Sequence, residues 1–232
     1  MSLEPLIMLP GLLCDERLFA AQLAPLRELA QVTVADLTRD DTIAGMARRV
    51  LERAPERFAL AGLSMGGYVA LEIMRQAPGR VSRLALMDTQ ARPDTAEASA
   101  MRRDLTALVG RGGFRGVSSR LMPRLLHAER LQDEDLVETV KAMAEAVGKD
   151  GFLRQQEAII GRIDSRPHLP AIACPTLVLC GREDVLTAPE LHLEMAAAIP
   201  QATLVVIPRA GHLAPMERPE PVTAQLRLWL RG

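Results

Sequence analysis

Ser64 has the clearest setting for nucleophilic chemistry in this chain. It stands in a Gly-x-Ser-x-Gly segment at 62–66, after an apolar run at 57–61 and before a helical pattern at 68–74. A strand, a glycine-flanked turn and a helix expose a serine at a sharp elbow, because the glycines allow close packing there. So short a motif also arises by chance, and the interpretation therefore depends on partner residues elsewhere in the chain.

A carboxylate and an imidazole follow two later strand-like runs. Asp184 comes after the apolar run 176–180, and His212 comes after the run 204–207. Because parallel strands place their carboxyl ends at one edge of a sheet, Ser64, Asp184 and His212 can meet there. A serine hydroxyl needs a base to take its proton. We therefore expect His212 to act as the base and Asp184 to orient its imidazole.

Apolar runs and helical patterns alternate through much of the chain. Strand-like runs are found at 6–9, 32–35, 57–61, 84–87, 174–180 and 204–207. Helical spacing of apolar residues is found at 18–29, 42–53 and 222–230. This alternation predicts an α/β fold with a mostly parallel sheet that is covered by helices on both faces.

The alternation stops between residue 93 and about residue 167, where only helical patterns occur. Apolar residues from Leu136 to Val147 form the strongest stripe, which Asp133 could cap, and a further helix is expected from 150 to 160. We predict a helical insertion at 93–168, after the fourth strand. The core would then consist of residues 1–92 and 169–232.

Together these features resemble the α/β-hydrolase superfamily. The resemblance rests on the serine elbow, the order Ser, Asp, His, the Gly-x-x-Asp segment at 181–184 and the Gly-His pair at 211–212. The small size and the inserted helices are similar to compact bacterial serine carboxylesterases of the pimeloyl-ester esterase and enol-lactone hydrolase type. The resemblance implies an α/β-hydrolase fold in which residues 93–168 form a lid over the active site.

The resemblance also implies backbone donors for an oxyanion. Met65 follows the serine and would supply one N–H; Leu12 would supply the second, with Leu13 as the alternative. The loop that holds Leu12 departs from the His-Gly pair usual in the family, because Pro10 stands where the histidine would be. The acyl site is expected to be apolar and lined by Leu12, Leu13, Met65, Leu121, Met122 and Leu125.

Other acids and histidines compete for the same roles. Glu183 would replace Asp184 if the loop were one residue out of register, and Asp88 follows a strand where some relatives place their acid. We favour Asp184. The remaining histidines have no matching partner and are expected at the surface or in the lid: His127, His168 and His192.

Composition limits the partners of the chain. The chain has 232 residues, of which 48% are hydrophobic and 25% are charged, and this composition predicts a globular domain. Its net charge of −1 gives no overall attraction to nucleic acid or to anionic membranes. Because no leader or membrane span is recognisable, we expect a cytoplasmic location. The cysteines Cys14, Cys174 and Cys180 lack metal-ligand spacing and are expected to be reduced, and we expect neither a metal nor a cofactor.

The lid is rich in arginine. We interpret its arginines as a solvated face rather than as a binding site for a substrate carboxylate or an acidic carrier protein. They are Arg102, Arg103, Arg111, Arg115, Arg120 and Arg124.

The leading hypothesis is a serine hydrolase that cleaves small or medium carboxylic esters through an acyl-enzyme on Ser64. The same three residues would also serve a thioesterase, a lactonase, a C–C bond hydrolase or a lyase of the menaquinone-pathway type, and the sequence does not separate these activities. A ligand-binding protein that keeps the fold without turnover is the alternative from another class. The sequence leaves the oligomeric state open.

Overall fold

The computed structural model describes residues 3–114, 116–117 and 121–232, which fold around a six-stranded sheet. The strands are β1 (Glu4–Leu9), β2 (Ala30–Val34), β3 (Phe58–Leu63), β4 (Val81–Met87), β5 (Thr176–Gly181) and β6 (Ala202–Ile207). Their order across the sheet is β2-β1-β3-β4-β5-β6, and each neighbouring pair is parallel. The prediction of a parallel sheet is confirmed, and all carboxyl ends lie at the same edge.

Burial along the strands follows their place in the sheet. Every residue of β3 and of β5 is buried, because helices cover both faces of the central strands. The edge strand β2 instead alternates between more and less exposed positions along Ala30–Val34. The two fully buried strands, β3 and β5, are thus central strands of the sheet, with a neighbour on each side.

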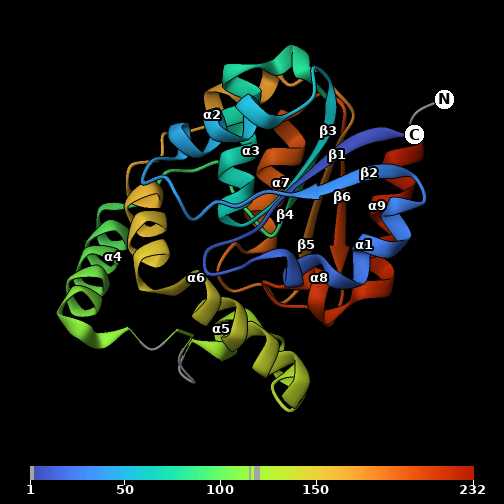
Figure 1. Cartoon of the computed structure of the whole chain (residues 1–232). Helices are drawn as coiled ribbons and strands as arrows, with labels where there is room; N and C mark the ends of the chain where they lie inside the picture. The colour runs from blue at the N-terminus through green and yellow to red at the C-terminus, as the bar shows by residue number, and fades with distance from the viewer. Residues whose placement is uncertain (1–2, 115, 118–120) are drawn as a thin grey trace.

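Helices cover both faces of the sheet (Figure 1). The first face is covered by α1 (Ala20–Arg27), α8 (Ala214–Glu217) and α9 (Pro219–Arg231). The opposite face is covered by α2 (Ile43–Arg53), α3 (Met65–Gln76) and α7 (Pro189–Ala198). Strand residues alternate between these layers: Met8 packs toward the first face and Leu9 toward the second.

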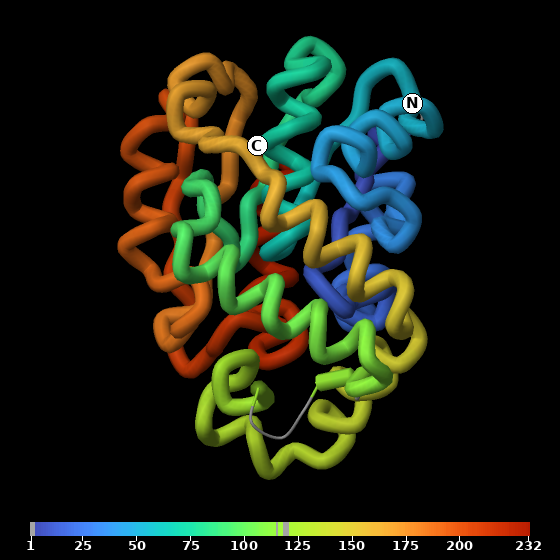
Figure 2. Tube along the Cα trace, turned by 90° about the vertical axis from the view of Figure 1, so that its left-hand side faces the viewer, coloured from blue at the N-terminus to red at the C-terminus, as the bar shows by residue number. Residues whose placement is uncertain are grey.

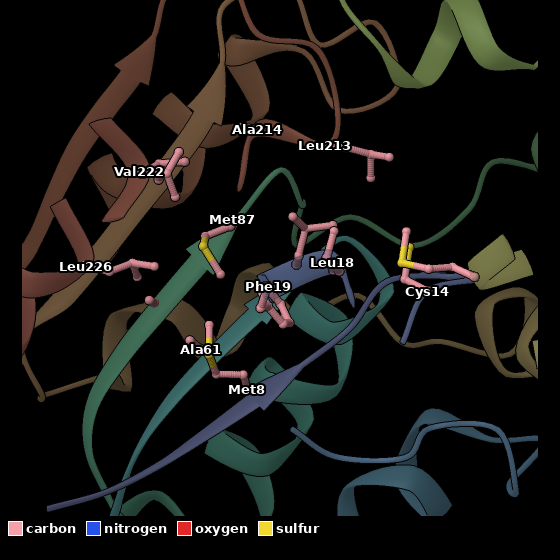
Figure 3. Packing of buried hydrophobic residues seen from close by; sticks show 14 of the residues in the cluster. Met8, Cys14, Leu18, Phe19, Ala61, Met87, Leu213, Ala214, Val222 and Leu226 are labelled. Carbon is pink, nitrogen blue, oxygen red and sulfur yellow. The ribbon is translucent and has the colours of Figure 1, made fainter. Parts of the chain in front are cut away.

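The hydrophobic core on the first face forms around the central strands, as Figure 3 shows. Phe19, at the end of the 3-10 helix Glu16–Phe19 (η1), is fully buried in one cluster with Met8, Ala61 and Leu226. Ala61 contributes a small side chain from β3, so larger residues from β1, η1 and α9 fill the space around it. This packing holds the amino-terminal loop against the sheet edge that carries the predicted site.

Between β4 and β5, helices are the only regular elements among the described residues, as predicted. They are α4 (Ala96–Leu108), the π-helical turn η3 (Val109–Gly113), α5 (Met122–Leu125), the 3-10 helix η4 (Ala128–Arg130), α6 (Glu134–Ile160) and the 3-10 helix η5 (Arg166–Ala171). A short 3-10 helix at Pro78–Arg80 (η2) precedes β4. Figure 1 shows α4 as the outermost helix, and Figure 2 shows it beside the second half of α6.

The helix α6 joins two segments that the sequence predicts as separate helices. Asp133 caps it as predicted, since its Oδ1 accepts a hydrogen bond from the N–H of Leu136 at 3.1 Å. Gly148 interrupts it with φ 70° and ψ 179°, which bends the helix without ending it. The part beyond Gly148 therefore runs in its own direction, toward the core.

A buried ion-pair cluster joins the lid to the core. Asp94 accepts hydrogen bonds from Arg162 at 2.6 Å and from Arg102 at 2.7 Å. Arg102 also donates to Gln156 of α6 at 2.8 Å, and the Arg162 guanidinium lies 4.3 Å from the centroid of the Tyr68 ring. The expectation that Arg102 belongs to a solvated face is therefore wrong, because three lid segments use it as an anchor.

Two of the cysteine thiols are unreactive because they are buried. Burial raises the pKa of Cys14 and of Cys180 to about 12, so neither thiol is a nucleophile near neutral pH. None of the described helices is both long enough and apolar enough to cross a membrane.

Candidate active site

Ser64 lies at a strained elbow between β3 and α3. Its backbone has φ 54° and ψ −116°, a conformation that non-glycine residues seldom adopt. The flanking glycines make the elbow sterically feasible. A Cβ atom on Gly62 would lie 2.3 Å from the carbonyl oxygen of Gly66, and one on Gly66 would lie 2.1 Å from that of Leu9. The turn thus projects Ser64 from the carboxyl edge of the sheet, where its side chain is partly exposed.

The structure brings Ser64, His212 and Asp184 together at this edge. The Oγ of Ser64 lies 2.9 Å from Nε2 of His212, and Nδ1 of His212 lies 2.8 Å from Oδ2 of Asp184. The three residues follow β3, β6 and β5, so the parallel sheet is what places them within contact distance. His212 and Asp184 are only 5% and 3% exposed, which shields their hydrogen bond from water.

The loop after β5 holds the Asp184 carboxylate firmly. Its Oδ1 accepts hydrogen bonds from the N–H groups of Leu186 and Thr187 at 2.8 and 3.0 Å, and its Oδ2 accepts one from the Thr187 hydroxyl at 2.6 Å. Burial alone would raise the pKa of Asp184. The proximity of His212, together with the bonds from His212 and Thr187, outweighs burial and lowers that pKa below its ordinary value. Asp184 is therefore ionised at neutral pH.

Neither competing acid contacts the imidazole of His212. Glu183 accepts a hydrogen bond from the N–H of Ala210 at 3.1 Å, and Asp88 accepts one from the N–H of Gly181 at 2.8 Å. Both acids thus support loops beside the three residues. The geometry leaves Asp184 as the partner of His212.

Asp88 is nevertheless an unusual carboxyl group. It is fully buried with φ 43°, and its Oδ2 has no hydrogen-bond partner among the described residues. Burial and the nearby charge of Asp184 raise the pKa of Asp88 well above its ordinary value. The pKa values of the two carboxyl groups are therefore shifted in opposite directions, that of Asp184 downward and that of Asp88 upward.

We expect Asp88→Asn to stabilise the protein, and more so at higher pH. Above the ordinary pKa of an aspartate, the unfolded chain releases a proton that folded Asp88 retains, so the contribution of Asp88 to stability falls as pH rises toward its folded pKa. Asparagine removes this loss. Thermal unfolding should show a Tm gain of about 2–4 °C near pH 8, the shift that about 1 kcal/mol gives in a domain of this size, and a smaller gain near pH 5. A gain that grows toward acid would contradict the assignment.

Glu217 supports the loop of His212, a role that sequence analysis missed. Its carboxylate accepts hydrogen bonds from the N–H groups of Gly211 at 2.8 Å, Leu213 at 3.3 Å and His127 at 2.5 Å. Burial raises the pKa of Glu217. Its position in the otherwise apolar stretch after His212 is the only sequence signal that could have identified it. This carboxylate joins the lid to the loop of the base.

The backbone N–H groups of Leu12 and Met65, both close to Ser64, have no acceptor in the described part of the chain. Met65 begins α3, where the first N–H groups have no partner within the helix. The loop of Leu12 is close to the serine, since a Cβ atom on Gly11 would lie 3.4 Å from the Cβ of Ser64. The N–H of Leu13 donates to Gln155 at 3.0 Å. Of the two alternatives, Leu12 therefore has the free donor.

The residues expected to line an acyl site share one apolar cluster with the lid. Leu13 and Met122 are buried in it, and three partly buried residues pack against it: Leu12, Leu121 and Leu125. Met65 differs, because its side chain is fully buried in the cluster on the opposite face of the sheet. We therefore correct the expectation for the Met65 side chain, which leaves its N–H as its contribution to the site.

The exposure of the other histidines and of the lid arginines agrees with the sequence prediction at some positions and differs at others. His168 is exposed and His127 is partly buried in the lid, as expected. The expectation for His192 is wrong: it is fully buried, its Nε2 accepts the N–H of Thr89 at 2.9 Å, and burial lowers its pKa to about 4. Three lid arginines are exposed: Arg103, Arg111 and Arg124. Two predicted lid arginines lie outside the described residues: Arg115 and Arg120.

Comparison with known proteins identifies similar chains. The model of an alpha/beta hydrolase family matches residues 7–225. A thermophilic esterase from Thermogutta terrifontis, solved with malate bound, is 34% identical; the match covers 99% of this chain and 90% of that one, with a TM-score of 0.89. An enol-lactonase from Burkholderia xenovorans LB400 is 26% identical; the match covers 99% of this chain and 92% of that one, with a TM-score of 0.89.

A curated relative from Mycobacterium tuberculosis completes the comparison. This candidate non-heme bromoperoxidase, BpoC, is 34% identical over 185 residues, which cover 77% of this chain and 70% of the relative. The similar proteins thus carry names of different activities on one fold.

Proposed function

The chain belongs to the alpha/beta hydrolase family, and within it we propose that this enzyme hydrolyses small or medium carboxylic esters through an acyl-enzyme on Ser64. The observation that carries the proposal is the chain of contacts from Ser64 Oγ to His212 Nε2 at 2.9 Å and from His212 Nδ1 to Asp184 Oδ2 at 2.8 Å. Similarity to the Thermogutta terrifontis esterase supports the choice of an ester as substrate.

Acylation begins with attack of the Ser64 oxygen on the ester carbonyl carbon. His212 takes the serine proton at Nε2, and the carbonyl oxygen becomes an oxyanion. The N–H groups of Leu12 and Met65 are the proposed donors to this oxyanion, each worth on the order of 3 kcal/mol in the transition state. The intermediate then collapses, His212 returns its proton to the leaving alcohol, and an ester of Ser64 remains.

Deacylation repeats these steps with water. His212 takes a proton from a water molecule that attacks the acyl carbon, and the same two N–H groups stabilise the second oxyanion. His212 then protonates the Ser64 oxygen as it leaves. The carboxylic acid is released and the serine is regenerated.

Asp184 fixes which nitrogen of His212 accepts the serine proton. An ionised carboxylate at Nδ1 accepts the N–H on that nitrogen, so Nε2 is left unprotonated and able to accept the serine proton. The negative charge also stabilises the imidazolium that forms in both steps. The lowered pKa of Asp184 supports this role, because the carboxylate stays charged throughout neutral conditions.

The apolar cluster suggests which part of the substrate the protein holds. Leu12, Leu13 and the lid residues Leu121, Met122 and Leu125 supply aliphatic surface, which suits an aliphatic acyl group. Lactones are a second candidate class, favoured by the similarity to the enol-lactonase. A lactone is a cyclic ester, so the same steps apply and the leaving alcohol stays attached to the acyl group.

A substrate panel tests the proposal. We expect multiple turnovers on p-nitrophenyl esters of graded acyl length, with slower or no turnover on matched acyl thioesters and with lactones as the second arm. A serine-directed phosphonate should label Ser64, as seen by peptide mass spectrometry, and should stop turnover in proportion to labelling. Stoichiometric binding of esters and lactones without turnover would instead indicate a ligand-binding protein of this fold.

A further inference from the structure

We propose that Gln155 of α6 is a positioning residue for the oxyanion donor at Leu12. This inference rests on the proposed function, because it assigns a role in the same serine site. Gln155 does not touch the substrate in this proposal. It acts through the loop after β1, which carries Leu12 past Ser64.

The loop after β1 is a tight turn with one strained residue. The N–H of Cys14 donates to the carbonyl oxygen of Gly11 at 3.2 Å, which closes a four-residue turn. Leu13, the third residue of this turn, has φ 60°, a value that favours glycine. A leucine at this position needs support from its surroundings to remain there.

Gln155 supplies that support from far along the chain. Its Oε1 accepts the N–H of Leu13 at 3.0 Å, and its Nε2 donates to the carbonyl oxygen of Leu37 at 3.2 Å. The side chain is only 1% exposed, so water does not compete for these bonds. The first bond fixes the central peptide of the turn, and therefore the direction of the preceding Leu12 N–H.

The two partners explain why a glutamine stands at this position. The Leu13 N–H requires an acceptor and the Leu37 carbonyl requires a donor, and one carboxamide provides both. An ionised glutamate would satisfy Leu13 but would place an oxygen against the Leu37 carbonyl. A methionine of similar length would leave both backbone groups buried without a partner.

The part of α6 that carries Gln155 is well attached to the core. Its neighbour Arg154 donates to the carbonyl oxygen of Thr38 at 2.7 Å, and Gln155 itself donates to the carbonyl oxygen of Leu37 at 3.2 Å. This half of the helix, beyond the bend at Gly148, therefore acts as a fixed support for the loop of Leu12. The lid contributes to the oxyanion site through this support.

The test compares three variants on the best substrate of the ester panel. Gln155→Met removes the acceptor from Leu13, while Gln155→Glu keeps an acceptor there. Gln156→Met is the matched control: it removes a buried glutamine (2% exposed) from the next position, and the partner of this glutamine is Arg102 of α4 rather than a residue of the turn. Tm is measured for each variant, so that loss of folding is separated from loss of positioning.

We expect Gln155→Met to lower kcat by about 10- to 100-fold, less than the loss of a whole oxyanion donor, with KM changed by less than about threefold. Gln155→Glu should recover most of this loss, and Gln156→Met should keep kcat within about twofold of wild type. The hydroxyl oxygen of Ser64 adds to the carbonyl carbon of an alkyl trifluoromethyl ketone, which places an oxygen anion at the N–H donors. The affinity of this ketone for Gln155→Met should fall by about the same factor as kcat. The corresponding carbinol cannot add the serine, and its binding should be unchanged.

Two results would overturn the inference. One is a folded Gln155→Met enzyme with wild-type kcat and wild-type affinity for the ketone; the other is an equal loss in folded Gln155→Met and Gln155→Glu. If Gln155→Met does not fold, Gln155→Asn takes its place: its shorter carboxamide withdraws the acceptor from the Leu13 N–H but keeps a polar group at this position. A folded Gln155→Asn enzyme with wild-type kcat and wild-type affinity for the ketone would then overturn the inference. Failure of the proposed function is distinct, because the wild type would then show no turnover of esters or lactones.

Discussion

Replacing Ser64 with alanine is expected to lower kcat for ester hydrolysis by a factor on the order of 10⁶, as removal of the nucleophilic serine does in a serine protease. The partner His212 stays in place, but no oxygen remains at 2.9 Å from its Nε2 to attack the carbonyl. The fold should be retained, because Ser64 is partly exposed and alanine fits the elbow no worse than serine does. Residual activity from bound water would be the only turnover left.

The measurement pairs kinetics with labelling. Ester hydrolysis and phosphonate incorporation are followed in Ser64→Ala and in a matched control, Ser82→Ala. The hydroxyl of Ser82 is buried in β4 and has no hydrogen-bond partner in the described part of the chain, so its loss should leave kcat within about twofold of wild type. A Ser64→Ala protein that keeps more than about 1% of wild-type kcat would reject the acyl-enzyme, given the loss expected without a nucleophile.

The second large effect is expected at Asp184. Asp184→Asn should lower kcat by about 10⁴-fold with little change in KM, as the equivalent change does where an aspartate orients a catalytic imidazole. Its carboxamide can donate to Nδ1, which moves the imidazole proton to Nε2 and prevents it from accepting the proton of Ser64. The hydrogen bonds from Leu186 and Thr187 should still hold the side chain in place.

Two variants of neighbouring acids serve as controls for Asp184→Asn. Glu183→Gln and Asp88→Asn each remove a carboxylate next to the site without touching His212, and kcat should stay within about threefold of wild type in both. If Asp88→Asn or Glu183→Gln lost as much as Asp184→Asn does, the acid would have been assigned to the wrong residue. Pre-steady-state kinetics would then show which step depends on it.

The sheet and its covering helices could be predicted because their signals are local. Continuous apolar runs such as those of β3 and β5 reflect burial on both faces, which is a property of the strand itself. The elbow of Ser64 is local as well, since Gly62 and Gly66 are the residues whose close packing allows it. Parallel strands then bring residues that follow them to one edge, however far apart they lie in the chain.

The supporting residues could not be predicted, because only distant contacts define them. Gln155 contacts Leu13 across 142 positions, and Glu217 contacts His127 across 90. His192 has no local feature that distinguishes it from a surface histidine, yet it is fully buried against the N–H of Thr89. The local sequence around a polar residue in a helix does not indicate which distant backbone group its side chain will bind.

The amino-acid sequence alone determined the α/β architecture and indicated that a serine, a histidine and an acid would meet at the sheet edge, because periodicity, glycines and chain order encode these features. Only the tertiary structure shows that Asp184 is the acid in contact with His212, and that the N–H of Leu13 is already bonded to Gln155. Those assignments depend on hydrogen-bond distances of about 3 Å between segments from different parts of the chain. Such distances are fixed by how the lid, the loops and the sheet pack together, which no local pattern specifies.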